Sequence, residues 1–158
     1  MAVKYIKNEN CLILLAITMK GELLRLSYTT ALNFDPIDDI ENQMACLLAR
    51  EADPQGERTI GVLTKPDTIE TGGPEERWKR VFIGLDNPLK LGYYVTKQPN
   101  PKELQDKISF VDARDREVAF FASMPLWSNM DTFLRSRLGT ANLVKFLSDQ
   151  LSGAIGAR

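Results

Sequence analysis

The chain has 158 residues, which is enough for one ordinary domain with a buried core and too few for two. Lys and Arg total 20 and Asp and Glu total 21, so the formal net charge of −1 makes no electrostatic case for nucleic acid as a partner. With 44% hydrophobic and 26% charged residues, the composition is that of a globular protein.

The residue counts exclude several kinds of catalytic and metal site. The chain contains no histidine, which removes Ser-His and Cys-His nucleophilic pairs, His-ligated metals and an imidazole base. Its two cysteines, Cys11 and Cys46, are too few for a disulfide framework or a structural zinc site. We expect buried, reduced thiols in a reducing cytosol. The longest apolar run ends at Met19, is too short to span a membrane and lacks signal-peptide flanks, which predicts a cytoplasmic protein.

The first half of the chain predicts two strands and a helix between them. Cys11 to Met19 is a continuous apolar run, typical of a strand buried on both faces. A helix is predicted from Asp38 to Ala52, with Asp38 and Asp39 at its N-terminus and residues 53–56 (Asp-Pro-Gln-Gly) ending it. Its apolar face is expected to carry Ile40, Met44, Leu47 and Leu48. A second buried strand follows from Arg58 to Thr64.

The second half predicts further helices and a third strand. A turn at 71–74 (Thr-Gly-Gly-Pro) starts a helix from Glu75 to Phe82, and a strand is predicted from Leu91 to Thr96, closed by residues 98–101. Two helices follow, at 111–123 and 140–155. The apolar residues of the first are Ala113, Val118, Phe120 and Phe121, and those of the second are Leu143, Val144, Leu147 and Leu151. Strands alternating with helices predict an α/β fold with a parallel sheet and helices on both faces.

The loop after the second strand reads Thr64-Lys65-Pro66-Asp67. Ligands of an open parallel sheet bind at the carboxyl ends of its strands. A carboxylate there can accept paired hydrogen bonds from N1–H and the exocyclic amine of guanine, a donor pair that adenine lacks. The aliphatic part of Lys65 can lie over the purine ring. The alternative is a capped turn with a surface ion pair.

The loop after the third strand, Thr96-Lys97-Gln98-Pro99, is expected at the same edge of the sheet. A lysine stem and a glutamine amide there can contact the base or the ribose. A solvated turn explains the same composition equally well.

Residues 48–67 closely resemble part of the second half of the dynamin superfamily GTPase domain. They read Leu48-Ala-Arg-Glu-Ala-Asp-Pro-Gln-Gly-Glu-Arg-Thr-Ile-Gly-Val-Leu-Thr-Lys-Pro-Asp67. The segments Asn10 to Leu14, Arg116 to Phe121 and Leu138 to Val144 also resemble that domain, and the third loop is closer to Mx-like and fungal dynamins. The resemblance implies a partial P-loop-NTPase-like parallel sheet with flanking helices, spanning residues 1–158. It also implies a self-assembling GTPase that hydrolyses GTP with Mg²⁺ and remodels membranes.

The resemblance assigns roles to individual residues. It implies guanine-nucleotide binding by Thr64, Lys65, Asp67, Lys97 and Gln98. Asp39 falls where the family places a contact between paired GTPase domains, although helix capping explains Asp39 more simply. Contact with membranes or microtubules, and a cytoplasmic location peripheral to membranes, follow from the family alone.

Two features depart from the family pattern. No glycine begins a Gly-x-x-x-x-Gly-Lys-Ser/Thr motif, and the family's phosphate loop and switch regions precede the point that matches Val3, so the chain carries no Mg²⁺ ligands from them. The segment from Gly21 to Ile37 interrupts the match and is too apolar for a surface loop. We interpret it as retained intron sequence in a truncated gene model, or alternatively as a lineage-specific insertion.

Three hypotheses about function follow. The first is a dynamin-type GTPase fragment that is inactive by itself. The second is a non-catalytic fragment that pairs with a complete dynamin-type GTPase domain, or a pseudogene product, with exposed strand edges and apolar surface. The third is an unrelated doubly wound domain with a coincidental Thr-Lys-Pro-Asp, which the agreement of several segments with one family disfavours.

Overall fold

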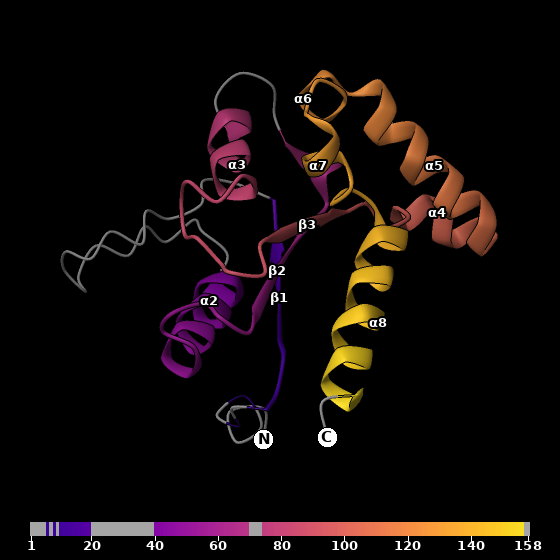
Figure 1. Ribbon diagram of the computed structural model, residues 1–158. Helices are drawn as coiled ribbons and strands as arrows, with labels where there is room; N and C mark the ends of the chain where they lie inside the picture. The colour runs from indigo at the N-terminus through magenta and orange to yellow at the C-terminus, as the bar shows by residue number, and fades with distance from the viewer. Residues whose placement is uncertain (1–5, 7, 9, 20–39, 70–73, 157–158) are drawn as a thin grey trace. The chain divides into compact units, whose positions relative to one another are not determined.

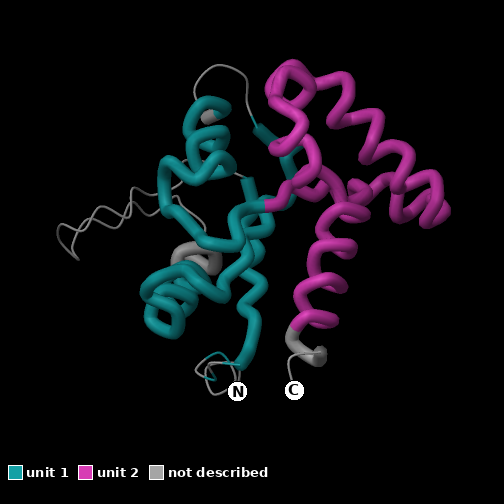
Figure 2. Tube along the Cα trace, in the orientation of Figure 1, with its two compact units in different colours: residues 1–93 teal, residues 94–158 magenta. Residues whose placement is uncertain are grey.

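The computed structural model describes residues 6, 8, 10–19, 40–69 and 74–156. They form two compact units, residues 1–93 and residues 94–158 (Figure 2). The interpretation of residues 21–37, the predicted caps Asp38 and Asp39, and the turn at 71–73 lie outside the described residues. None of the helices described is long and apolar enough to cross a membrane.

The described residues form an α/β fold with a three-stranded parallel sheet and flanking helices, as predicted (Figure 1). The strands β1 (Ile13–Thr18), β2 (Thr59–Thr64) and β3 (Tyr93–Thr96) lie in the order β1-β2-β3. The register of β1 and β2 pairs Ile13 with Thr59 and continues to Thr18 opposite Thr64. The central strand β2 is buried from Thr59 to Leu63, as its continuous apolar run indicates.

The edge strand β1 is buried on one face only, which corrects the prediction of burial on both. Leu15 is 8% exposed, whereas its neighbour Leu14 is 52% exposed, and Ala16 is exposed as well. A strand is buried on both faces only where other elements cover both. An apolar run by itself carries no information about which elements do so.

The helix α2 (Ile40–Ala52) packs against β1. It ends at Ala52, as the following Asp-Pro-Gln-Gly predicts, and Gly56 supplies a positive φ of 62°. The predicted apolar face is wrong in part, because Met44 and Leu47 are each about half exposed while Ala49 is 5% exposed. Cys46, like Cys11, is a free thiol that is half-buried rather than buried.

Asp53 and Arg58 hold the turn between α2 and β2 in place. The buried Asp53 carboxylate accepts hydrogen bonds from Glu57 N–H and Arg58 N–H, both at 3.0 Å, and from the Thr59 hydroxyl at 2.6 Å. The Arg58 guanidinium donates to the carbonyl oxygens of Cys11 and Ala52, at 2.8 and 2.7 Å. The charged side chains of Asp53 and Arg58 therefore fix the start of β2 against the end of α2 and the residues that precede β1.

The remainder of unit 1 contains one further helix and a close contact between two strands. Helix α3 (Pro74–Phe82) starts at the predicted proline and buries Trp78, Val81 and Phe82. Gly61 of β2 lies so close to Tyr93 that a Cβ on Gly61 would be 2.1 Å from the ring carbon Cδ1. The Tyr93 hydroxyl donates to the Asn87 carbonyl oxygen at 2.7 Å, and burial raises its pKa above the ordinary value.

Unit 2 contains two long helices that were predicted and three short ones that were not. The long helices are α5 (Phe110–Ser123) and α8 (Thr140–Gly156). The short ones are α4 (Pro101–Gln105), α6 (Pro125–Ser128) and α7 (Thr132–Arg135). Leu138 forms an isolated parallel bridge to Val95 of β3, which brings the start of α8 beside the end of that strand.

The buried faces of α5 and α8 differ from those predicted. Helix α5 buries Ala113, Glu117 and Phe121, whereas Val118 is 67% exposed. Helix α8 buries Leu143, but Val144 and Leu151 are more than half exposed. Periodicity therefore selected Ala113, Phe121 and Leu143 correctly and Val118, Val144 and Leu151 wrongly, because both helices carry more apolar residues than their buried faces use.

Candidate functional site

The turn after β2 is a short 3-10 helix, Pro66–Thr68, that is held by a hydroxyl group. The Thr68 hydroxyl donates to the carbonyl oxygens of Lys65 at 2.9 Å and Met19 at 3.2 Å. The Thr64 hydroxyl donates to the Ile17 carbonyl oxygen at 3.2 Å. Thr64 and Thr68 therefore serve the backbone of this turn, and the turn needs no help from the charged side chains between them.

Lys65 and Asp67 extend from this turn into solvent. Lys65 has a left-handed backbone, with φ 56° and ψ 50°, which is unusual for a residue other than glycine and often marks a functional turn. Both side chains are exposed, and neither has a hydrogen bond or an ion pair with any residue that the structure describes. The alternative of a surface ion pair is thus not found among those residues.

The loop after β3 is held at both of its ends. At one end, the Lys97 N–H donates to Oε1 of Glu117 at 2.8 Å, and the Lys97 ammonium lies 5.8 Å from the centre of the Phe120 ring. At the other end, Asn100 and Glu103 form a capping box at the start of α4. The Asn100 N–H and Arg116 together lower the pKa of Glu103. Gln98 lies between these two anchors and is exposed.

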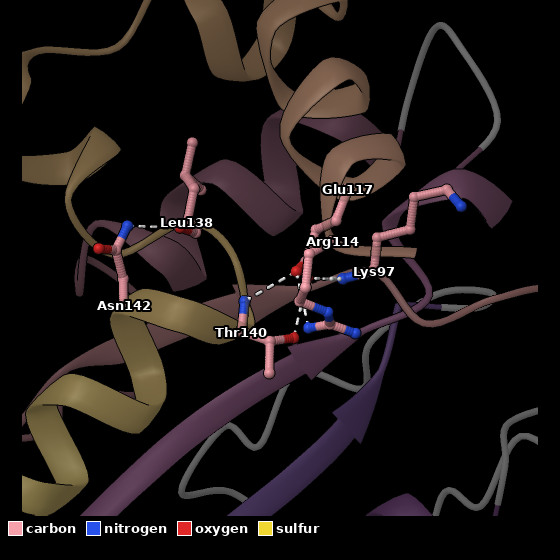
Figure 3. A network of polar contacts seen from close by, with 6 residues as sticks. All are labelled: Lys97, Arg114, Glu117, Leu138, Thr140 and Asn142. Atoms are coloured by element: carbon pink, nitrogen blue, oxygen red, sulfur yellow. Dashed lines mark hydrogen bonds and ion pairs between the residues drawn. The ribbon is translucent and has the colours of Figure 1, made fainter. Parts of the chain in front are cut away.

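Glu117 is the centre of a polar network inside unit 2 (Figure 3). Its side chain, 2% exposed, comes from α5 and points toward Lys97 and Thr140. Oε1 accepts from Lys97 N–H and from the Thr140 hydroxyl at 3.0 Å, and Oε2 accepts from Thr140 N–H at 3.0 Å and from Arg114 at 2.9 Å. All of the acceptor positions of the carboxylate face donors, which is what a buried charge requires.

The structure thus places the predicted site residues in two groups. Thr64, Lys65 and Asp67 share one turn of unit 1, and Lys97 and Gln98 are adjacent in unit 2. Asp39 lies outside the described residues. Glu117 and Thr140 are not among the residues that the sequence predicts for the site. The signal for Glu117 was present, because an acidic residue midway between Ala113 and Phe121 on a buried helical stripe needs partners.

The described residues do not include a group of three or more acidic or cysteine side chains that could hold a metal ion.

Comparison with known proteins gives concordant results. A family model described as the dynamin central region matches residues 79–157, half of the chain. The interferon-induced GTP-binding protein Mx2 of Sus scrofa is 44% identical over 87 residues, which cover 55% of this chain and 12% of that protein. Mx1 of Equus caballus is 40% identical over 92 residues, covering 58% and 14% of the two chains. The corresponding Mx protein of Perca fluviatilis is 42% identical over 83 residues, covering 52% and 27%.

The aligned part of the chain spans about a quarter or less of the length of these relatives. The family model nevertheless covers half of the chain, and it covers β3 and all the helices of unit 2. The chain therefore belongs to the dynamin superfamily.

Proposed function

We propose that this chain is the latter half of a dynamin-type GTPase domain and supplies the side of the site that recognises the guanine base. The observation that carries the proposal is the turn after β2. There, Thr64 and Thr68 bind the backbone, while Lys65 and Asp67 extend outward without a partner among the described residues. The names of the relatives, which are GTP-binding proteins, support guanine nucleotide as the ligand.

The chemistry assigns one role to each charged residue. The Asp67 carboxylate accepts N1–H and the 2-amino group of guanine, and the Lys65 stem packs on the purine ring. A carboxylate that is desolvated by a base without this donor pair loses its hydrogen bonds with water and gains none, so adenine is rejected. Lys97 and Gln98 contact the base or the ribose. These residues bind GTP and perform no chemistry.

GTP hydrolysis enters this proposal only as the activity of the family. GTP hydrolysis with Mg²⁺, coupled to self-assembly and membrane remodelling, requires a phosphate loop and switch regions. The sequence contains no phosphate-loop motif, so we propose that the chain by itself is inactive. A cytoplasmic location, peripheral to membranes or microtubules, forms part of the same family-based proposal.

An Asp67→Asn variant tests base recognition directly. An asparagine amide donates to the 2-carbonyl group of xanthine and accepts its N1–H, but it presents a donor to the 2-amino group of guanine. We expect the variant to bind GDP about tenfold more weakly and XDP more tightly, as measured by titration of the 158-residue chain in NMR spectra. Asp115→Asn, which changes an exposed carboxylate of α5, is the control and should leave both titrations unchanged. Equal binding of GDP and ADP by the unaltered chain would refute the proposal.

A second candidate function is supported by exposed apolar residues in unit 1. Leu14 on the edge strand β1 and Met44 and Leu47 on α2 are each about half exposed. These residues favour an interaction fragment that pairs with a complete dynamin-type GTPase domain through that strand. Light scattering of the chain mixed with such a domain should show a complex that Leu14→Lys weakens. Failure to form any complex would eliminate this alternative.

A further inference from the structure

The loop that carries Lys97 and Gln98 is bonded to a buried side chain of α5 at Lys97. Within the described residues, the Lys97 N–H has one acceptor, Oε1 of Glu117, at 2.8 Å. The same oxygen accepts from the Thr140 hydroxyl at 3.0 Å, and Thr140 is the first residue of α8. One carboxylate from the middle of α5 therefore joins the loop after β3 to the N-terminus of α8 (Figure 3).

The geometry of the loop makes this bond important for the direction of the lysine side chain. Thr96, immediately before Lys97, is buried in β3, and Asn100, three residues later, is fixed by the capping box of α4. Between these points the Lys97 amide is the one backbone donor of the described loop that is bonded to a side chain of α5. The bond sets the plane of the peptide from which Lys97 extends over the Phe120 ring.

We propose that Glu117 is a positioning residue for guanine-nucleotide binding: its buried carboxylate holds the Lys97 backbone so that Lys97 and Gln98 face the nucleotide. The proposal rests on the function proposed above. Glu117 itself touches no ligand, and it acts through the amide of Lys97. Its Oε2 bonds with Thr140 N–H and Arg114 serve to fix the carboxylate against α8 and α5.

The substitution Glu117→Gln separates the bond to the Lys97 amide from the Oε2 bonds that fix the side chain. A glutamine amide has one oxygen and one NH₂ group. The Oε2 position faces Thr140 N–H and the charged Arg114, neither of which can accept a hydrogen bond, so the amide oxygen takes that position. The NH₂ group then faces the Thr140 hydroxyl, which can reverse and accept, and the Lys97 N–H, which cannot. The variant therefore removes the Lys97 bond selectively.

The experiment measures amide exchange and GDP binding on the 158-residue chain by NMR. In Glu117→Gln we expect the Lys97 amide to exchange about tenfold to a hundredfold faster, while the Thr140 amide stays protected. GDP should bind about tenfold more weakly than to the unaltered chain. Thr140→Val is the control within the network, because it removes one bond to Oε1 and leaves the Lys97 bond. Asp131→Ala is the control for stability, because it removes the N-cap of α7 in the same unit.

The outcomes separate this inference from the proposed function. Faster Lys97 exchange together with weaker GDP binding in Glu117→Gln, and in neither control, supports the inference. Unchanged GDP affinity in a folded Glu117→Gln variant overturns it and leaves the proposed function standing. Absence of GDP binding by the unaltered chain overturns the proposed function. Should Glu117→Gln fail to fold, an amide-to-ester substitution at Lys97 removes the same donor, and unchanged GDP affinity there overturns the inference equally.

Discussion

Asp53 and Asp67 lie on either side of β2, and their surroundings give them different properties. Asp53 is buried and its oxygens accept three hydrogen bonds, whereas Asp67 is exposed and has no partner among the described residues. Asp67 is predictable from the sequence, because a carboxylate just after a buried strand lies at a ligand-binding edge. From the sequence Asp53 is predicted only as part of a turn, although its hydrogen bonds hold the start of β2.

The stability of the protein should depend on pH through Asp53. Burial by itself raises the pKa of this carboxyl, but the hydrogen bonds from Thr59, Arg58 and Glu57 and the charge of Arg58 outweigh it, so the pKa is lowered. A lowered pKa in the folded state contributes stability above the unfolded value of about 3.9, and this contribution is lost as the pH falls through the folded value. Asp53→Asn should therefore reduce the free energy of unfolding by about 1–3 kcal/mol at pH 7.

Urea unfolding between pH 7 and pH 3 measures this effect. The difference in free energy of unfolding between the unaltered chain and Asp53→Asn should shrink below about pH 4, where the unfolded carboxyl binds a proton. Asp67→Asn is the matched control, since its side chain is exposed, and should change the free energy of unfolding by less than about 0.5 kcal/mol. A difference that stays constant across this pH range would show that Asp53 contributes no pH dependence.

Gly61 is a second residue that matters for stability, because the Tyr93 ring packs directly against it. A Cβ at this position would lie 2.1 and 2.3 Å from two carbons of the Tyr93 ring, distances that require the ring or the strand to move. We expect Gly61→Ala to lower the free energy of unfolding by about 3 kcal/mol in urea denaturation. Gly153→Ala in α8 is the control, because nothing lies within 4 Å of its Cβ position, and it should stabilise by about 0.5–1 kcal/mol. Equal stability of the two variants would contradict the close approach.

At the level of whole elements, the sequence located the strands and the long helices well but assigned their faces poorly. Strand β2 and helices α2, α3, α5 and α8 begin and end within two residues of their predicted bounds. Pro74 and the Asp-Pro-Gln-Gly turn at 53–56 mark such boundaries by local backbone chemistry. The faces depend on which neighbour is present. Helix α2 exposes Met44 and buries Ala49 because burial is decided by contact with other elements and not by hydrophobicity.

Strand β1 offers a matched test of its one-sided burial. Leu14 and Leu15 are adjacent residues of the same type, with exposed fractions of 52% and 8%. Leu15→Ala should cost about 2–4 kcal/mol of the free energy of unfolding, because it leaves a cavity in the core, whereas Leu14→Ala should cost less than about 1 kcal/mol. Urea denaturation of the two variants under one set of conditions measures both values. Similar costs would mean that the second face of β1 is also covered.

For the molecule as a whole, membership of the dynamin superfamily does not by itself imply catalysis by this chain. Catalysis of phosphoryl transfer comes almost entirely from a phosphate-binding loop, metal ligands and the positioning of water. The sequence has no Gly-x-x-x-x-Gly-Lys-Ser/Thr motif.

We therefore expect the purified 158-residue chain to release no phosphate from GTP in the presence of Mg²⁺. A phosphate-release assay checks this, with Asp67→Asn as the control for contaminating enzymes. Turnover that disappears in Asp67→Asn would show that the chain is itself a GTPase. Turnover that persists unchanged in that variant would come from a contaminant.

By itself the sequence determined the α/β class, the positions of β2 and of the long helices, the superfamily and the turn that carries Lys65 and Asp67. These depend on local patterns: apolar runs, helix-ending residues and a motif at the end of a buried strand. Only the tertiary structure decided that β1 is buried on one face, that Gly61 touches Tyr93, and that Glu117 joins the Lys97 amide to Thr140. These contacts bring together residues 20 or more positions apart, and local sequence patterns do not encode which distant groups meet.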